Sequence, residues 1–282
     1  MNTAAPSTVS STAPSTAPSA ATAAVPATAP PLQTWFEADG ALLRLRLARP
    51  KANIVDAAMI GALQKALDAQ TGQPGLRGVL LDAEGPHFSF GASVEEHLAE
   101  RCAAMLAALH GLLLTLVDWP VPVLVAVRGQ CLGGGLELAL AGGPIFAGTD
   151  AQFGQPEIKL GVFAPAASAL LPWRVSAAAA EDLLCSGRSI GAERALAIGL
   201  VQAVADDPAA AALAYFEDHL APRSAAALAC ALEAARAPRR AELRRRLAEL
   251  EQLYVGRLMK TRDANEGLAA FLARRAPQWE HC

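Results

Sequence analysis

Short apolar runs alternate along this chain with longer segments in which apolar residues recur every three or four positions. The alternating leucines of residues 41–47 predict a strand that pairs, through a turn at 38–40, with a strand at 35–37. The apolar positions between Asp56 and Leu67 follow a helical period, and aspartate is a residue type that caps helices. Strands that alternate with helices in this way predict an α/β fold.

The same alternation continues through the middle of the chain. Ser93, followed by Glu96 three residues later, has the form of a capping box and predicts a helix over 94–117 that Pro120 stops. From residue 209 onward the pattern predicts helix to the end of the chain. Further apolar runs predict strands at 78–82, 88–90, 121–127, 145–147 and 200–204.

The chain divides into three parts by composition. Residues 1–31 are almost wholly Ala, Ser, Thr and Pro and carry no charged side chain, so we expect a disordered extension without a core. Residues 32–208 form the predicted α/β core and contain the candidate site. Residues 209–282 form a predicted helical C-terminal region.

Composition and charge exclude several classes of function. A net charge of −3 over 282 residues argues against polyanion binding through overall charge. The five cysteines are scattered without a CxxC pair and the five histidines form no HExxH pattern. We therefore expect reduced thiols, no metal site and a cytoplasmic location. No apolar run is long enough to cross a bilayer, so no membrane association is expected.

The candidate chemistry centres on a triple glycine. The predicted strand 121–127 is followed by Gly133, Gly134 and Gly135, which allow the backbone to approach a ligand closely. A helix begins near these glycines, so its unpaired N–H groups and its dipole favour an oxyanion. Glu137 lies in the first turn of this helix, beside the expected ligand.

A second strand-to-helix junction and a second acid complete the candidate site. The run 88–90 ends at Gly91 and Ala92, and Glu157 follows a proline in the segment 152–157. Backbone N–H groups of Ala92 and Gly134 could together hold a carbonyl oxygen that gains negative charge. Glu137 and Glu157, if they converge in an apolar pocket, supply a general acid and a general base. Together these groups predict enolate chemistry.

Other glycine-rich and nucleophilic motifs do not match. The glycines lack the GxGxxG spacing, and Leu136 stands where a phosphate-binding loop needs lysine. No serine lies in a GxSxG elbow. Cys131 is a candidate nucleophile, but no histidine is near it in sequence, and small buried cysteines are common.

The motifs resemble those of the crotonase, or enoyl-CoA hydratase/isomerase, superfamily. The resemblance covers nearly everything after Leu32 and implies a spiral core of ββα turns with a helical C-terminal trimerisation region. It also implies a homotrimer or dimer of trimers and a CoA thioester whose carbonyl oxygen is bound by the N–H groups of Ala92 and Gly134. The matching segments are PKANIVDAAM (50–59), HFSFGAS (87–93), VRGQCLGGGLELAL (127–140), FGQPEIKLGV (153–162) and RDANEGLAAFLARRAPQW (262–279).

The resemblance also implies roles for the two acids. The hydratases of this family carry both glutamates, whereas many of its isomerases, hydrolases and dehalogenases lack one, so hydration is favoured. By motif position, Glu157 transfers the proton on carbon and Glu137 chiefly holds and deprotonates the water. Arg49, Lys51 and Ala52 are the candidate contacts of the CoA part, and no cofactor besides the CoA of the substrate is expected.

Departures from the family pattern concern the acyl pocket. A glycine-rich loop is usual after the second acid, but this chain has residues 163–168, FAPAAS, which are stiffer and bulkier. Phe90 replaces a small residue, and with Gly133, Phe163 and Pro165 it is a candidate substrate contact. These strings resemble hydratases of anaerobic aromatic degradation that add water 1,4 across cyclohexa-1,5-dienecarbonyl-CoA.

Three alternatives remain open at this point. The chain could be a general enoyl-CoA hydratase or isomerase of fatty-acid β-oxidation, or a catalytically idle CoA-binding scaffold, which retention of both acids disfavours. Some members of this family are reported to bind RNA through a basic helix, and arginines crowd the segment 238–250. Glu242 and Glu249 interrupt these arginines, so a solvated helix or subunit contact is favoured over nucleic-acid binding. The arginines are Arg239, Arg240, Arg244, Arg245 and Arg246.

Overall fold

The computed structural model describes residues 30–282 of the chain. The predicted disordered extension, residues 1–31, lies outside the described part except for its last two residues. That prediction and the division at residue 208 therefore stay predictions.

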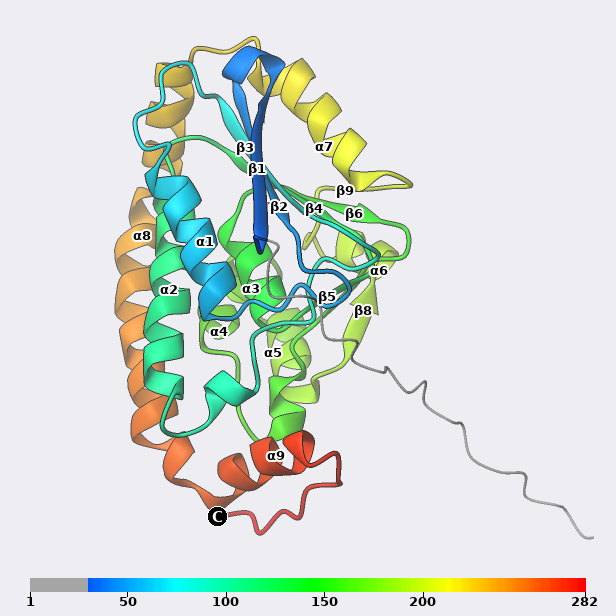
Figure 1. Cartoon of the computed structure of the whole chain (residues 1–282), viewed down its shortest axis with the longest axis vertical. Coiled ribbons are helices and arrows are strands. Elements are labelled where there is room, and N and C mark those ends of the chain that lie inside the picture. The colour runs from blue at the N-terminus through cyan, green and yellow to red at the C-terminus, as the bar shows by residue number, and fades with distance from the viewer. Residues whose placement is uncertain (1–29) are drawn as a thin grey trace, which may run out of the picture.

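Two sheets form the framework of the described chain (Figure 1). The larger sheet has the strand order β1-β2-β3-β4-β6-β9, and only β1 runs antiparallel to its neighbour. The smaller sheet has the order β5-β7-β8. The strands are β1 (Leu32–Glu37), β2 (Leu42–Leu47), β3 (Gly78–Ala83), β4 (Val123–Val127), β5 (Gln130–Leu132), β6 (Ile145–Gly148), β7 (Gln152–Gly154), β8 (Ser189–Gly191) and β9 (Ala203–Ala205).

Helices cover both faces of the larger sheet. In Figure 1, α1, α2 and α8 lie on one side of this sheet and α7 on the other. A large apolar core fills the first side, and a smaller one, which includes Leu80, Leu124 and Phe216, fills the second. The helices are α1 (Ala57–Asp68), α2 (Cys102–Asp118), α3 (Gly134–Ala141), α4 (Pro165–Leu170), α5 (Ala177–Ser186), α6 (Ala192–Ala197), α7 (Pro208–Tyr215), α8 (Ala225–Gly256) and α9 (Arg262–Leu272).

The chain repeats one ββα unit. In each turn a strand of the larger sheet leads into extended chain of the smaller sheet and then into a helix, as in β4, β5 and α3. In the preceding turn we predicted a strand at 88–90, but this prediction is wrong. The run joins β5 only by the bridge between Ser89 and Cys131. Successive turns therefore stack in parallel, so equivalent positions of neighbouring turns lie side by side.

The predicted helix over 94–117 begins later than expected. A short 3₁₀ turn covers Glu95–His97, Leu98 is extended with ψ 149°, and α2 starts only at Cys102. The capping box is also wrong, because Glu96 accepts hydrogen bonds from the Ala57 N–H and thus binds the start of α1. A tertiary contact has taken the carboxylate that the local pattern assigned to its own helix.

The end of the chain also departs from the prediction of continuous helix. Helix α9 stops at Leu272, and the last ten residues, 273–282, are not helical. The N–H groups of Glu280 and His281 donate to the carboxylate of Asp263, each over 2.8 Å. These bonds fold the terminal segment back onto the first turn of α9.

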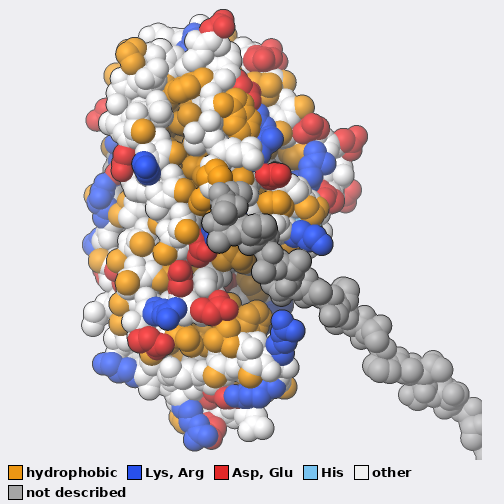
Figure 2. Space-filling model, viewed as in Figure 1, with side chains coloured by type: hydrophobic (Ala, Val, Ile, Leu, Met, Phe, Trp, Pro, Cys, Tyr) orange, Lys and Arg blue, Asp and Glu red, His pale blue; other side chains and the backbone are white. Residues whose placement is uncertain are grey.

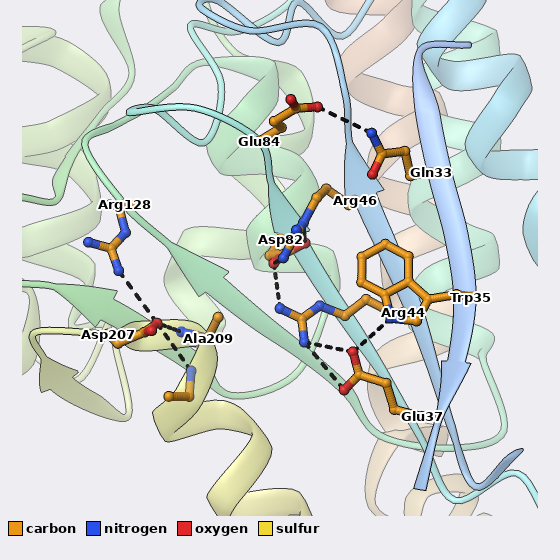
Figure 3. Close-up of polar contacts among 11 residues, drawn as sticks. Gln33, Trp35, Glu37, Arg44, Arg46, Asp82, Glu84, Arg128, Asp207 and Ala209 are labelled. Atoms are coloured by element: carbon orange, nitrogen blue, oxygen red, sulfur yellow. Dashed lines mark hydrogen bonds and ion pairs between the residues drawn. The ribbon is translucent and has the colours of Figure 1, made fainter. Parts of the chain in front are cut away.

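Charged side chains are buried on the larger sheet, where the leucine pattern predicts only one apolar face. Asp82 in β3 accepts hydrogen bonds over 2.6 Å from both Arg44 and Arg46 of β2 (Figure 3). Arg44 also pairs with Glu37, and both guanidinium groups lie over the ring of Trp35. We call these five residues the sheet ion cluster, and they lie on the same face of the sheet as the residues that α7 covers. They are Trp35, Glu37, Arg44, Arg46 and Asp82.

Candidate active site

The stacking of two ββα turns brings Ala92 and Gly134 together. Ser89 and Cys131 face each other in the smaller sheet, and Ala92 and Gly134 each follow three residues later. A Cβ atom on Gly134 would lie only 3.1 Å from the Ala92 nitrogen, so a side chain there would crowd this approach. Within residues 30–282, neither of these two N–H groups donates a hydrogen bond. Two adjacent free donors are what an oxyanion requires.

Gly133 makes room for the second acid. Its φ of 50° and ψ of −127° belong to backbone that side-chain-bearing residues rarely adopt. A Cβ atom on Gly133 would overlap the Oε1 atom of Glu157. The carboxylate of Glu157 therefore lies directly against the glycine that precedes α3, next to the free N–H of Gly134.

Helix α4 holds Glu137. This side chain is 4% exposed, and its Oε1 accepts a hydrogen bond of 2.8 Å from the Ala167 N–H in the first turn of α4. Burial raises the pKa of Glu137, while the Ala167 N–H and the charge of His110 lower it in part. The structure thus places Glu137 in the first turn of α3, as predicted, and supplies its partner from the segment that departs from the family pattern.

Glu157 has an environment that favours its protonated form. Burial, and then the neighbouring charge of Glu137, raise the pKa of Glu157 to about 8. Near neutral pH one carboxyl group of the pair can therefore be protonated while the other is ionised. Neither carboxylate has a lysine or arginine among its partners in the part of the chain described.

Gln155 is a residue of this site that the sequence interpretation missed. It is 1% exposed, and with its amide nitrogen turned toward Glu157 it donates to Oε1 and Oε2 over 3.2 and 3.0 Å. The signal available in sequence was its place two residues before the acid in the segment FGQPE. Gln155 orients the Glu157 carboxyl group without adding charge.

The predicted substrate contacts lie around this centre at different depths. Phe163 is half-buried, with its ring centre 5.5 Å from that of Tyr254, and Pro165 is the first residue of α4. Phe90 is 43% exposed, and its ring meets that of His87 edge-on at 4.9 Å. The segment that we expected to be a stiff loop is therefore partly the first turn of a helix.

The predicted CoA contacts differ in their availability. Ala52 accepts a hydrogen bond of 2.9 Å from the Phe90 N–H, which ties its loop to the extended segment that leads to Ala92. Lys51 is exposed and stays available for a phosphate. The guanidinium group of Arg49 is bound to the carboxylate of Asp56 and the carbonyl of Ile54. Arg49 therefore serves first to fix the start of α1.

The arginine-rich part of α8 is largely neutralised. Asp118 forms ion pairs with Arg240 and Arg244. Arg245 pairs with both Glu242 and Glu249. Glu249 also pairs with Arg246. On the face of the molecule in Figure 2, acidic and basic side chains are interspersed and form no large field of one sign. These pairs favour a solvated helix surface over a phosphate-binding one.

Within residues 30–282, no three His, Cys, Asp or Glu side chains gather closely enough to hold a metal ion. The helices of this same part are all too short or too polar to cross a membrane.

The fold and the site define a class of protein. A ββα spiral that presents two free N–H groups beside two buried carboxyl groups is built for acid–base chemistry next to a carbonyl group. The family model for enoyl-CoA hydratase/isomerase matches residues 37–281. The chain belongs to this family and is an enzyme.

Individual relatives agree with this assignment. A cyclohexa-1,5-dienecarbonyl-CoA hydratase of Thauera aromatica is 59% identical over 251 residues, which cover 89% of this chain and 97% of the relative. A probable enoyl-CoA hydratase of Bacillus subtilis (strain 168) is 33% identical over 246 residues. These residues cover 84% of this chain and 94% of that relative. The crystal structure of an enoyl-CoA hydratase from Mycobacterium avium superposes with a TM-score of 0.78 at 28% identity, over 88% of this chain and 98% of that one.

Proposed function

We propose that this chain is a hydro-lyase that adds water to cyclohexa-1,5-diene-1-carbonyl-CoA and yields 6-hydroxycyclohex-1-ene-1-carbonyl-CoA. This reaction would be a step in anaerobic degradation of aromatic compounds through benzoyl-CoA. The similarity to the hydratase of Thauera aromatica, 59% over nearly the whole chain, supports this substrate. The observation that carries the chemistry is the placement of Glu157 against Gly133, beside the free N–H groups of Gly134 and Ala92.

In this proposal the two N–H groups receive the thioester oxygen. As the water oxygen bonds to the β carbon, the electron pair of the diene moves toward the carbonyl, and the thioester oxygen becomes an oxyanion. The N–H groups of Ala92 and Gly134 stabilise this dienolate because they are already in place and exchange no solvent during the step. The N-terminal end of α3 adds a partial positive charge at the same point.

The two acids then divide the proton transfers. Glu137, ionised, takes a proton from the attacking water, while Glu157, protonated, gives its proton to carbon as the dienolate collapses and the carbonyl reforms. The raised pKa of Glu157 supports this division, because it keeps a proton available near neutral pH. In a 1,4-addition the hydroxyl group goes to the β carbon and the proton to the far end of the diene.

The acyl pocket in this proposal is bounded by Phe163, Pro165, Phe90 and Gly133. The first turn of α4 is fixed by Pro165 and by the hydrogen bond from Ala167 to Glu137, so this wall is rigid. A flat ring suits such a wall better than a long flexible chain does. Lys51, Ala52 and, through its loop, Arg49 would lie near the CoA part.

Several broader features belong to the same proposal. The protein would work without a cofactor other than the CoA of its substrate, in the cytoplasm, as a homotrimer or a dimer of trimers. Membership of the enoyl-CoA hydratase/isomerase family supports these features, because they are expected for that family.

The test is a direct assay. Purified protein is given cyclohexa-1,5-dienecarbonyl-CoA and, separately, crotonyl-CoA, and loss of thioester conjugation is followed together with the mass of the product. We expect turnover of the cyclic substrate with a gain of one water. Turnover of crotonyl-CoA alone would favour the β-oxidation type of hydratase, to which the relative from Bacillus subtilis points. If the folded protein turns over neither thioester, the proposal is wrong.

A further inference from the structure

A second polar group is buried behind the acid pair. His110 in α2 is 2% exposed and Tyr254 in α8 is fully buried. The Nδ1 atom of His110 lies 2.5 Å from Oε1 of Glu251, while His110 Nε2 and the Tyr254 hydroxyl have no hydrogen-bond partner among residues 30–282. Buried polar atoms are nearly always partnered, so two orphans in one region call for an explanation.

These side chains lie where four helices meet. Helices α2, α3, α4 and α8 pack against one another, and Glu251 and Tyr254 are three residues apart on the same face of α8. The ring of Tyr254 packs against Phe163, two residues before α4, and the first turn of α4 binds Glu137. His110 and Tyr254 are therefore neighbours of the segment that holds Glu137.

Charge effects place the same groups within electrostatic reach of the acids. After burial and the Ala167 N–H, the charge of His110 is the next influence on Glu137, and it lowers the pKa of that acid. Burial raises the pKa of Tyr254, and the charges of Cys102, Glu157 and Glu137 raise it further. Such influences are strong only between groups that are close or share a dry interior.

Of these three titratable residues, only the outermost is partly exposed. The side chain of Glu251 is 35% exposed, that of His110 is 3% exposed, and Glu137 is 4% exposed. The two nitrogens of an imidazole lie on different edges of the ring, so a histidine held at Nδ1 by an outer carboxylate can present Nε2 to an inner group. Carboxylate, imidazole and carboxylate therefore occur in sequence from the solvent to the active site.

We propose that His110, held by Glu251 and assisted by the Tyr254 hydroxyl, conducts protons between Glu137 and solvent. The inference rests on the proposed function, in which each turnover leaves Glu137 protonated and Glu157 ionised. The proton on Glu137 passes, through a water bound by the two orphan atoms, to His110 Nε2. The Nδ1 proton passes to Glu251 and then to solvent, and Glu157 takes a proton back from solvent. A turn of the imidazole ring then restores the tautomer that carries its proton on Nδ1. Atoms and charge balance over the cycle, and His110 is a relay residue that acts through Glu137.

Titratable groups from the neighbouring helices face this region. Glu251 of α8 contacts His110, and Glu137 of α3 is within reach of its charge. Tyr254 of α8 is reached by the charges of Cys102, Glu157 and Glu137. Helix α4 contributes no titratable side chain, and Lys65 and Asp68 of α1 are exposed. Within the described residues, Glu251 is the partly exposed carboxylate that contacts His110, so it is the outlet of the proposed relay.

The first test uses kinetics of the full-length protein. We expect His110→Asn and Glu251→Gln to lower kcat for the cyclic thioester by about tenfold while KM stays the same. The reason is that these variants slow the removal of the proton from Glu137 after each turnover and leave substrate binding intact. Added imidazole should restore His110→Ala several-fold and make kcat depend on buffer concentration. Tyr254→Phe should lower kcat less but keep or raise the melting temperature, since it removes an unpartnered hydroxyl. A merely structural role would lower the melting temperature and give no rescue.

Matched controls lie on the other face of the larger sheet. His219→Asn and Tyr215→Phe alter a histidine and a tyrosine whose rings meet each other at 4.9 Å near α7, and neither should change kcat. If His110→Asn and Glu251→Gln retain wild-type kcat, with no rescue and no buffer dependence, the relay is wrong. Should the His110 variants fail to fold, Glu251→Gln and Tyr254→Phe decide the question by the same criteria.

A second test does not depend on activity. The imidazole resonances of His110 are followed by NMR in the wild type and in Glu137→Gln at one pH, and removal of the inner carboxylate should shift the Nε2 and Cε1 resonances. Unchanged resonances would contradict the relay even if the enzyme is active. Conversely, a wild type that turns over no thioester refutes the proposed function, while these resonances still report whether His110 and Glu137 are coupled.

Discussion

Carboxylates are buried in two regions of this molecule, and the two regions treat them in opposite ways. Asp82, 4% exposed, lies between the guanidinium groups of Arg44 and Arg46 in the sheet ion cluster (Figure 3). Glu137, equally buried, has a backbone N–H as its partner, and Glu157 has the amide of Gln155. Both regions satisfy hydrogen bonds, but only the first neutralises charge.

The difference separates structure from chemistry. A carboxylate between two cations stays ionised, and its charge contributes to the cohesion of the sheet. A carboxylate beside another carboxylate in a buried site is driven toward protonation, so the pair can both give and accept a proton near neutral pH. Variants of the two regions should therefore fail in different assays.

The largest expected effect is on stability, from Asp82→Asn. Removing this charge leaves the guanidinium groups of Arg44 and Arg46 without their shared partner, and we expect a loss of about 3–5 kcal/mol in the free energy of unfolding. Chemical denaturation measures it, with exposed Asp206→Asn as the control. The kcat of the folded fraction should stay within about twofold. A fall in kcat at unchanged stability would assign the sheet ion cluster to the function instead.

Glu157→Gln should show the opposite behaviour. Removal of a general acid lowers turnover by at least about a hundredfold, while the buried like-charge repulsion is relieved and the melting temperature is kept or raised. Steady-state kinetics and thermal unfolding measure the two properties, with exposed Glu233→Gln as the control. Near-normal turnover would move the proton transfer on carbon to Glu137 or to another residue.

The pH dependence should follow the raised pKa of Glu157. Hydration needs its protonated form, so kcat should fall by roughly tenfold per pH unit above about pH 8. The folded state binds this proton more tightly than the unfolded state does, so stability is fully present in acid and is lost as pH rises toward and through 8. Melting temperatures over this range should decline in the wild type and not in Glu157→Gln. A kcat that stays constant to pH 10 would contradict the assignment.

Gly133→Ala probes the geometry of the site without removing an acid. The new methyl group would overlap Glu157 Oε1, and the backbone at φ 50° would be strained by about 1–3 kcal/mol. We expect a displaced carboxyl group and a loss of roughly tenfold in kcat, or about 1.4 kcal/mol. Gly61→Ala, in α1 with open space around its Cβ, is the matched control and should be slightly stabilising. Equal kcat in both variants would show that Glu157 does not work from its position against Gly133.

The smallest effect is expected from Lys51→Gln. An exposed lysine that meets a CoA phosphate contributes about 0.2–1 kcal/mol, so KM should rise only a few-fold, with kcat unchanged. The increase should shrink at high salt, because screening weakens the same contact in the wild type. Lys65→Gln, on the exposed face of α1, is the control. A change in kcat would indicate that Lys51 acts nearer the reacting atoms.

Local patterns predict much of the framework. The residues Met59, Ile60, Leu63 and Leu67 are the buried positions of α1, and Asp56 caps it by accepting from the Met59 N–H. The strand, the glycines and the helix that carries Glu137 also lie where the sequence places them, and the family fold is confirmed. These features depend on residues near one another in the chain.

The errors come from partners that are distant in sequence. Glu96 was assigned to its own helix but binds the start of α1, 39 residues away in the chain. The alternating leucines of residues 41–47 left Arg44 on the face opposite the predicted apolar one, although Arg44 is buried. No local pattern indicated that His110 and Glu251, which lie 141 residues apart, would meet. The roles of the site residues stay predictions until the variants are measured.

The hydrogen bond from Ala167 to Glu137 has a consequence for any attempt to redesign this enzyme. Pro165 starts α4, and the Ala167 N–H in its first turn lowers the pKa of Glu137 against the effect of burial. The segment proposed to bound the acyl pocket therefore also influences the acidity of Glu137. Exchanging residues 163–168 for a glycine-rich loop to admit linear acyl chains would also remove Pro165 and the helical turn that aims the N–H of residue 167 at Glu137. If the proposed acyl pocket is correct, substrate preference and acid strength are coupled through one short helix and cannot be engineered independently.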